Sequence, residues 1–175
     1  VAGAPEGSAA PLVWATGFRN PYGFGVDPKT GRVVVGDIGE ETVEELNIVA
    51  AGEDFGWPKF EGPPPDGQGG DSIAPALWYR HTDTPTPPCV SIIGGPIIRD
   101  AKEIESDLDG AFIFTDFGCG YVWAARTSKT EVTKLFLLAR TGRQVTSLEQ
   151  GPDGAIYAIS IAPDTGRIDR IARDF

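Results

Sequence analysis

The segment Asp27-Pro-Lys-Thr-Gly-Arg-Val-Val-Val-Gly-Asp37, inside the stretch 14–57, decides the fold. Its first five residues are a tight-turn signal, and the alternating run over 32–37 predicts a β-strand that is entered through this turn. A second short strand is predicted over 45–49. The loop between these strands can expose backbone carbonyl and amide groups, and it holds Gly36, Asp37, Gly39 and Glu40.

The same design recurs twice later in the chain. A turn with Asp and Gly is followed by a strand that ends in a polar residue, in Asp109-Gly-Ala-Phe-Ile-Phe-Thr-Asp116 and in Asp153-Gly-Ala-Ile-Tyr-Ala-Ile-Ser160. Gly110 and Gly154 lie 44 positions apart, and Gly31 lies 79 positions before Gly110. A period of about 40–45 residues with several short strands in each unit is typical of the blades of a β-propeller.

The expected strands fall into three groups, and only residues 101–108 carry a helical signal. We therefore predict an all-β fold with about three blades. Propellers usually close with four to eight blades, so three blades require a further half, supplied by missing sequence, a second chain or a copy of the same chain. The expected strands are 12–15, 23–26, 32–37 and 45–49; 91–99, 111–115, 121–126 and 134–139; and 145–150, 155–161 and 167–172.

Composition excludes several classes of function. The 175 residues carry a formal net charge of -10, which argues against nucleic-acid binding, because that function requires a basic face. No apolar run approaches the roughly 20 residues that a membrane-spanning helix needs.

We expect residues 1–11 to form a flexible lead and 12–175 to form the propeller part. A long Pro- and Gly-rich loop is expected at about 52–88. The opening sequence fits a processed secreted protein, an internal fragment or one piece of a longer chain.

Two cysteines, Cys89 and Cys119, lie 30 positions apart. They could be two buried thiols or one disulfide that ties neighbouring strands. We favour the disulfide, because both residues flank apolar strand patterns and turn glycines. A disulfide implies an oxidising compartment, so the predicted location is extracellular or periplasmic. A zinc site is not expected, because the chain has one histidine and its cysteines are far apart.

Seven motifs together resemble the soluble quinoprotein sugar dehydrogenases of the glucose/sorbosone dehydrogenase family. The resemblance runs from about residue 12 to the C-terminus. In chain order the motifs are Gly17-Phe-Arg-Asn-Pro-Tyr-Gly-Phe, Gly36-Asp-Ile-Gly, Glu45-Leu-Asn-Ile-Val, Asp54-Phe-Gly-Trp-Pro, Ile93-Gly-Gly-Pro-Ile-Ile-Arg, Gly110-Ala-Phe-Ile-Phe-Thr-Asp-Phe and Thr165-Gly-Arg-Ile-Asp-Arg-Ile.

The resemblance implies a six-bladed β-propeller of which this chain is the C-terminal half. It also implies pyrroloquinoline quinone (PQQ) and calcium at the mouth of the central channel, a sugar substrate and an electron acceptor. The family's catalytic base is a histidine in the other half, so no catalytic residue is expected in this chain. His81 does not match that base, and packing or capping beside residues 78–80 is its expected role.

The resemblance also assigns residues to the expected site. Arg19 and Asn20 match a cofactor-contacting pair, and Arg99 falls where the family places a basic residue that faces the quinone. Residues 117–121, where one branch of the family adds arginines, contain none. The two cysteines have parallels in another branch, which supports the disulfide.

Calcium prefers carboxylate and carbonyl oxygens. Gly39 and Glu40 match the loop whose carbonyls reach the quinone-bound calcium, and Glu45 with the Phe55 carbonyl matches a second oxygen site. Without the motif, Glu44 and Glu45 would read as an ordinary solvated acidic pair.

Two functions follow from these observations. One is the C-terminal half of a PQQ-dependent aldose dehydrogenase. The other is a non-catalytic extracellular propeller that binds partners or assembles through its exposed sheet edges.

Overall fold

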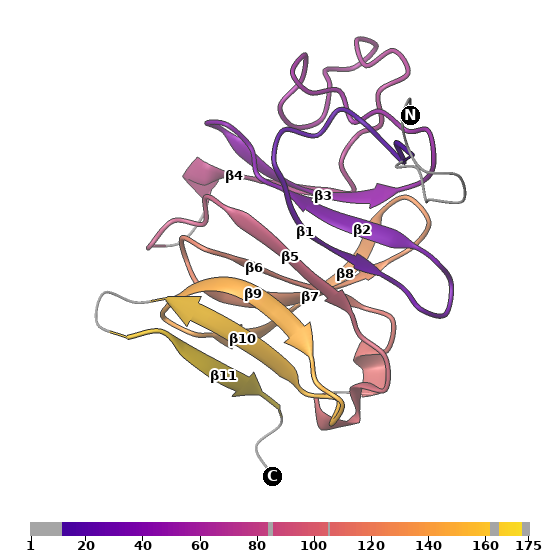
Figure 1. Cartoon of the computed structure of the whole chain (residues 1–175). Helices are drawn as coiled ribbons and strands as arrows, with labels where there is room; N and C mark the ends of the chain where they lie inside the picture. The colour runs from indigo at the N-terminus through magenta and orange to yellow at the C-terminus, as the bar shows by residue number, and fades with distance from the viewer. Residues whose placement is uncertain (1–11, 84–85, 105, 162–164, 173–175) are drawn as a thin grey trace, which may run out of the picture.

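Three antiparallel sheets make up the part of the chain that the computed structural model describes, residues 12–83, 86–104, 106–161 and 165–172 (Figure 1). The expected flexible lead, 1–11, lies outside these residues. The first two sheets have four strands each and the third has three. The strands are β1 (Pro21–Val26), β2 (Val33–Asp37), β3 (Val43–Val49) and β4 (Leu77–Arg80); β5 (Ile92–Ile97), β6 (Phe112–Asp116), β7 (Tyr121–Thr127) and β8 (Val132–Arg140); and β9 (Gln144–Gln150), β10 (Ile156–Ile161) and β11 (Arg167–Ile171).

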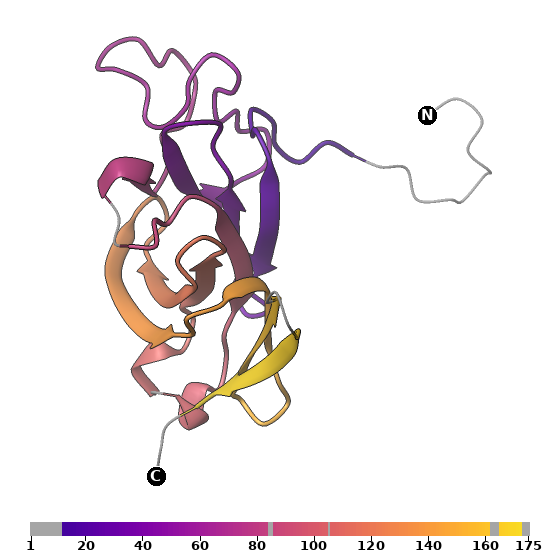
Figure 2. The same cartoon turned by 90° about the vertical axis from the view of Figure 1, so that its left-hand side faces the viewer.

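Each sheet is a meander in which consecutive strands pair, and the sheets follow one another along the chain (Figure 2). The first strands of the sheets, β1, β5 and β9, pack against one another and line a groove of about 720 Å³. β1 and β5 can approach closely because Gly23 and Gly94 have no side chains. A Cβ atom on either glycine would collide with the other residue's carbonyl group. This is the arrangement of three neighbouring propeller blades around a channel, and it confirms the predicted fold.

Two expectations about local structure were wrong. Residues 12–15 form no strand, and next to them Thr16 makes only an isolated bridge with Asp54. The fourth strand of the first blade is β4, which lies inside the segment that we expected to be a loop. Its alternation places Leu77 and Tyr79 toward the core and leaves Trp78 and Arg80 exposed. The helical signal over 101–108 yields two short 3-10 turns, Ala101–Glu103 and Ser106–Leu108.

Hydrophobic cores lie between neighbouring blades rather than inside them. Val34 and Leu46 of the first sheet meet Ile92 and Phe114 of the second. Val122 of the second sheet packs in one cluster with Ile156 of the third. A smaller cluster covers part of the other face of the first sheet, where Phe18 and Phe55 stack with ring centroids 4.7 Å apart. The blades are thus held mainly by burial of apolar side chains between sheets.

The two outermost sheet faces keep exposed apolar side chains. Tyr22, Phe24 and Val26 of β1 are exposed on the first sheet. Ile159 and Ile168 of the third sheet are paired across β10 and β11 and are also exposed. None of the helical segments in the described residues is long and apolar enough to cross a membrane.

Buried polar residues at the ends of β2, β6 and β10 explain the repeated sequence design. Asp37 accepts hydrogen bonds from the backbone N–H groups of Arg19 and Asn20, at 3.0 and 2.7 Å, directly before β1. Asp116 does the same directly before β5, with N–H groups at 3.1 and 2.8 Å. Ser160 takes this place in the third blade. The first two blades are therefore fixed at their entries by the carboxylate that ends the second strand, and in the third blade Ser160, one residue before the end of β10, accepts a hydrogen bond from the Arg143 side chain.

We expect Asp116→Ala to lower the free energy of unfolding by about 3–5 kcal/mol, because several donors lose a buried acceptor. Besides the two entry N–H groups, Asp116 accepts hydrogen bonds from Gly118 N, Cys119 N and the Tyr79 hydroxyl. Tyr79→Phe removes one donor only and should cost about 1 kcal/mol. Urea unfolding of both variants measures the difference. Equal losses would show that the carboxylate does not hold the blade entry.

Candidate functional site

Arg19 and Asn20 lie at the end of the blades where β1, β5 and β9 begin, which we call the upper end. Their backbone is fixed by Asp37, while the Asn20 side chain is exposed. The Arg19 guanidinium donates a long hydrogen bond of 3.4 Å to the Ile38 carbonyl and lies 5.8 Å from the centre of the Trp57 ring. Within the described residues it forms no ion pair, so its charge is available to a bound anion.

A cavity of about 10 Å³, with room for no more than one ion or water molecule, brings four of the predicted site residues together, namely Arg19, Gly39, Glu45 and Phe55. They come from the entry of β1, the loop after β2, the start of β3 and the long connection after it. The remaining lining residues are Gly17, Asp37, Trp57, Phe60 and Glu61.

Glu45 is buried in this site, which contradicts the alternative of a solvated acidic pair; its neighbour Glu44 is fully buried as well. Glu45 accepts hydrogen bonds from Gly62 N at 2.6 Å and from Asn47 Nδ2 at 3.2 Å. Burial raises the pKa of Glu45, and the charges of Asp37 and Glu61 add to this rise. Asn47 Oδ1 is buried without a hydrogen-bond partner. A cation near Glu45 would therefore relieve both the repulsion between carboxylates and an unsatisfied oxygen.

Glu61 organises the loop that carries Gly39 and Glu40. Its Oε1 accepts hydrogen bonds from four successive backbone N–H groups, those of residues 40–43, at 2.8–3.2 Å. A side chain at Gly39 would collide with the Val43 carbonyl and with Glu61. Because C=O and N–H point in opposite directions across a trans peptide, the Gly39 and Glu40 carbonyls point away from Glu61. This is the orientation that carbonyl ligands of an outside cation need.

Sequence reasoning missed Glu61, since it stands in an irregular Pro- and Gly-rich segment with no pattern to mark it. Burial opposes ionisation of Glu61, but the N–H groups of Thr42, Glu41 and Val43 lower its pKa to about 2. The residue is therefore a permanent anion near neutral pH, and it sets the loop's shape from a position 18–21 residues away.

Arg99 lies at the other end of the sheets, which we call the lower end. It follows β5 and forms a two-pronged ion pair with Asp27, with Nε–Oδ1 and Nη2–Oδ2 distances of 3.0 and 2.6 Å. Its Nη1 contacts Asp109 at 2.7 Å. The structure therefore does not bring Arg99 together with the other predicted site residues.

Arg143 is a basic residue at the upper end that sequence reasoning missed. It directly precedes β9, as Asn20 directly precedes β1, and its Nε donates to Ser160 Oγ at 3.1 Å. The blade repeat is the signal that could have found it. Residues 117–121, where one branch of the family adds arginines, contain Cys119 of the disulfide instead.

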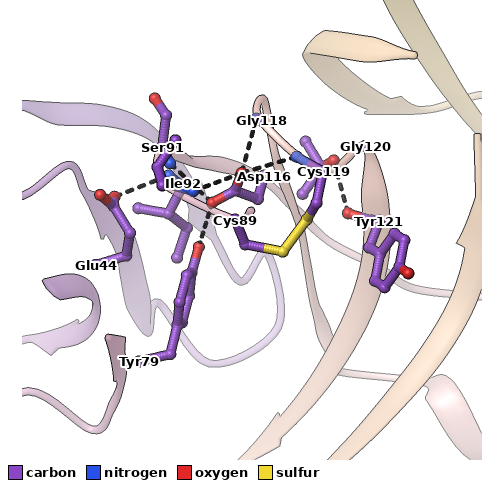
Figure 3. The surroundings of a disulfide bond; sticks show 12 residues. Glu44, Tyr79, Cys89, Ser91, Ile92, Asp116, Gly118, Cys119, Gly120 and Tyr121 are labelled. Carbon is purple, nitrogen blue, oxygen red and sulfur yellow. Dashed lines mark hydrogen bonds between the residues drawn. A yellow bond between two sulfur atoms is a disulfide. The ribbon is translucent and has the colours of Figure 1, made fainter. Parts of the chain in front are cut away.

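The predicted disulfide between Cys89 and Cys119 is confirmed, with Cα atoms 4.8 Å apart (Figure 3). Figure 3 shows Asp116 between this disulfide and Tyr79. Cys89, Cys119 and Asp116 form the only group of three potential metal-binding side chains found among the described residues. Both sulfur atoms are bonded to each other, so the group is not a metal site.

His81 lies beside Glu44, with its Nε2 at 2.8 Å from Glu44 Oε1. Glu44 Oε2 in turn accepts a hydrogen bond from the Ile92 backbone of the second blade at 2.9 Å. Burial raises the pKa of Glu44 to about 7. The histidine thus has a structural place at a blade interface, which agrees with the packing or capping role expected for it.

Comparison with known proteins gives a consistent picture. The family model described as Glucose / Sorbosone dehydrogenase matches residues 3–170. An uncharacterised protein of Synechocystis is 42% identical over 169 residues, which cover 87% of this chain and 37% of that protein. The aldose sugar dehydrogenase YliI of Escherichia coli is 32% identical over 53 residues, which cover 30% of this chain and 14% of that protein.

Solved structures show the same fold. A PQQ-bound aldose sugar dehydrogenase of Streptomyces coelicolor matches with a TM-score of 0.68 and 18% identity, over 98% of this chain and 48% of that one. The apo form of the soluble aldose sugar dehydrogenase of Escherichia coli matches with a TM-score of 0.70 and 18% identity, over 96% and 49%. The chain thus spans about half the length of these propeller structures.

We expect Glu61→Gln to lower the free energy of unfolding by about 1–2 kcal/mol at pH 7, because four charge-assisted hydrogen bonds become neutral ones. The folded pKa, about 2, lies below the ordinary value of 4.5. The stabilisation by the ionised Glu61 is therefore present above pH 4.5 and disappears as the pH falls toward 2. Unfolding curves of both proteins should converge over this range. A gap that stays constant down to pH 2 would contradict the assignment.

Proposed function

Because the chain belongs to the glucose/sorbosone dehydrogenase family, we propose that the complete protein is a PQQ-dependent oxidoreductase acting on aldose sugars. This chain supplies part of the cofactor and calcium pocket at the upper end of its blades. The observation that carries the proposal is that Arg19, Gly39, Glu45 and Phe55 converge on one ion-sized space. Its residues come from four separate segments, and each had been assigned to the pocket from its motif alone.

The basic and amide groups at the entry of β1 fit a quinone with several carboxylates. Arg19 presents a planar guanidinium without an ion pair in the described residues, and this group suits bidentate contact with a carboxylate. Asn20 adds an exposed amide beside it. Their backbone is locked by Asp37, so little conformational entropy would be lost when a ligand binds. Arg143 offers a second guanidinium at the entry of the third blade.

Two groups of oxygens fit calcium. The Gly39 and Glu40 carbonyls are turned outward by the contacts with Glu61. Glu45 and the Phe55 carbonyl form the second group, where the unpartnered Asn47 Oδ1 and the crowded carboxylates support a cation. These are the hard oxygen donors that calcium prefers.

Bound PQQ with its calcium supplies the electron-accepting quinone that takes hydride from the sugar. Arg19 and Asn20 hold and orient the carboxylate-bearing side of the cofactor. Glu61 keeps the carbonyl-bearing loop in the shape that seats the metal. The base that removes the sugar's hydroxyl proton is assigned to the half of the propeller outside this chain, and an acceptor molecule takes up the electrons. Arg99 has a structural role at the lower end, and the proposal does not rely on it.

The missing part of the propeller is proposed to cover the two exposed sheet faces, at Tyr22–Val26 and at Ile159 and Ile168. Exposed apolar patches of this kind mark surfaces that another element covers, and the chain spans about half of the similar propellers. The disulfide supports a secreted or periplasmic location.

A non-catalytic propeller that only binds partners is the competing function. The experiment below separates it from the dehydrogenase function.

We expect Arg19→Gln in the full-length protein to weaken PQQ binding roughly ten- to a hundredfold, because a charge-assisted contact contributes about 1.5–3 kcal/mol. Arg80→Gln serves as the control, since Arg80 is exposed on β4 and its guanidinium lies over the Trp78 ring. Quinone absorbance in the presence of calcium measures binding, and sugar-dependent reduction of a dye measures turnover. If the unaltered protein neither binds PQQ nor reduces the dye, the binding-only function holds instead.

A further inference from the structure

A second cavity, of about 290 Å³, lies at the lower end between the first two blades. It opens where β1, β5 and β7 end, so it is remote from Arg19 and independent of the proposed cofactor pocket. Three arginines line it, namely Arg32 from the first blade and Arg99 and Arg126 from the second. Arginines from two blades therefore converge on one small space in a chain whose net charge is -10.

Two of these arginines already have structural partners. Arg99 binds Asp27 and Asp109, as described above. Arg32 donates to the Gly110 carbonyl at 2.8 Å and to the Thr127 carbonyl at 3.1 Å, which ties the first blade to the second. Its nearest carboxylate oxygen, on Asp27, is 3.8 Å away. Arg126 differs from both, because its guanidinium has neither a hydrogen bond nor an ion pair within the described part of the chain.

Unsatisfied buried donors concentrate in the residues that line this cavity. Four buried side-chain nitrogen or oxygen atoms in the described residues have no hydrogen-bond partner, and three of them belong to residues that line it. They are Arg32 Nε, Arg126 Nε and Thr127 Oγ1. A buried donor without an acceptor costs about 1–3 kcal/mol, so three of them around one space indicate that an acceptor belongs there.

The charges select the kind of acceptor. Three arginines face two carboxylates, Asp27 and Asp109, so one positive charge is left over. Hydrogen bonds from Arg99 and Thr30 overcome the effect of burial and lower the pKa of Asp27 well below its ordinary value, which keeps it ionised and paired. A water molecule could accept hydrogen bonds but could not neutralise Arg126, whereas a small anion does both.

We propose that this cavity binds a small tetrahedral oxyanion of the phosphate or sulfate class. Arg126 is its main charged contact, and Arg32 and Thr127 donate further hydrogen bonds. The cavity of about 290 Å³ has ample room for an ion of this size, and the selection rests on its charge. Because Arg32 belongs to one blade and the other two residues to the next, the bound anion also joins two neighbouring blades.

The test uses the full-length protein without added PQQ. Thermal unfolding and isothermal titration are carried out with sodium phosphate and sodium sulfate, against sodium chloride at the same ionic strength. We expect a saturable rise in Tm with either oxyanion. Arg126→Gln should abolish this rise and weaken binding at least tenfold. It should not lower the Tm in chloride, because the side chain has no partner to lose. Thr127→Val should weaken binding several-fold.

Arg140→Gln is the matched control, since Arg140 is exposed at the opposite end of the same sheet, where it pairs with Tyr121 in the β7–β8 ladder. It should keep the full oxyanion effect. An equal rise in chloride, or a rise that persists in Arg126→Gln, would overturn the proposal. The same holds if Arg126→Gln destabilises the protein equally with and without oxyanion, because Arg126 would then be purely structural. If Arg126→Gln does not fold, an undiminished affinity of Thr127→Val would count against the site.

Discussion

The buried carboxylates that end β2 and β6 are the constraint on which the rest of the structure depends. A propeller blade begins with a chain segment that turns sharply into the channel wall, and the backbone N–H groups of that segment cannot pair with the sheet. Asp37 and Asp116 accept these hydrogen bonds at two successive blades. Leaving such a buried N–H group without an acceptor would cost about 1–3 kcal/mol. Because the segment before β1 carries Arg19 and Asn20, the hydrogen bonds to Asp37 also fix the backbone of the two residues proposed to bind the cofactor.

The two ends of the blades use charge in opposite ways. At the upper end Glu45 is buried beside other carboxylates, and the amide oxygen of Asn47 has no hydrogen-bond partner among the described residues. At the lower end Arg32 and Arg99 bond across the first two blades, and Arg126 forms no ion pair within the described residues. An excess of acid with oxygen donors suits a cation, and an excess of guanidinium suits an anion. The two ends of one sheet stack thus differ in the sign of the charge that is crowded there.

The interblade cores explain why half a propeller leaves two apolar faces. Each sheet buries one face against the previous blade and one against the next, so a run of three blades necessarily ends in two uncovered faces. Part of the first face is covered locally by Phe18 and Phe55. The third blade lacks such a cover over Ile159 and Ile168. The exposed apolar side chains therefore lie where neighbouring blades would pack in a closed propeller.

The sequence by itself determined the blade repeat, because the spacing of Asp-Gly turns and alternating strands is local. It also determined the disulfide preference and the motif positions of Arg19, Gly39 and Glu45. It misplaced the fourth strand of the first blade, since β4 stands in an irregular Pro- and Gly-rich connection and is selected by the packing of Leu77 and Tyr79 against the core. Only the tertiary structure decided that Glu61 shapes the loop of Gly39 and Glu40 and that Arg99 lies at the far end. Such contacts join residues tens of positions apart, and the free energy of burying and pairing a charge depends on what surrounds it rather than on its neighbours in the chain.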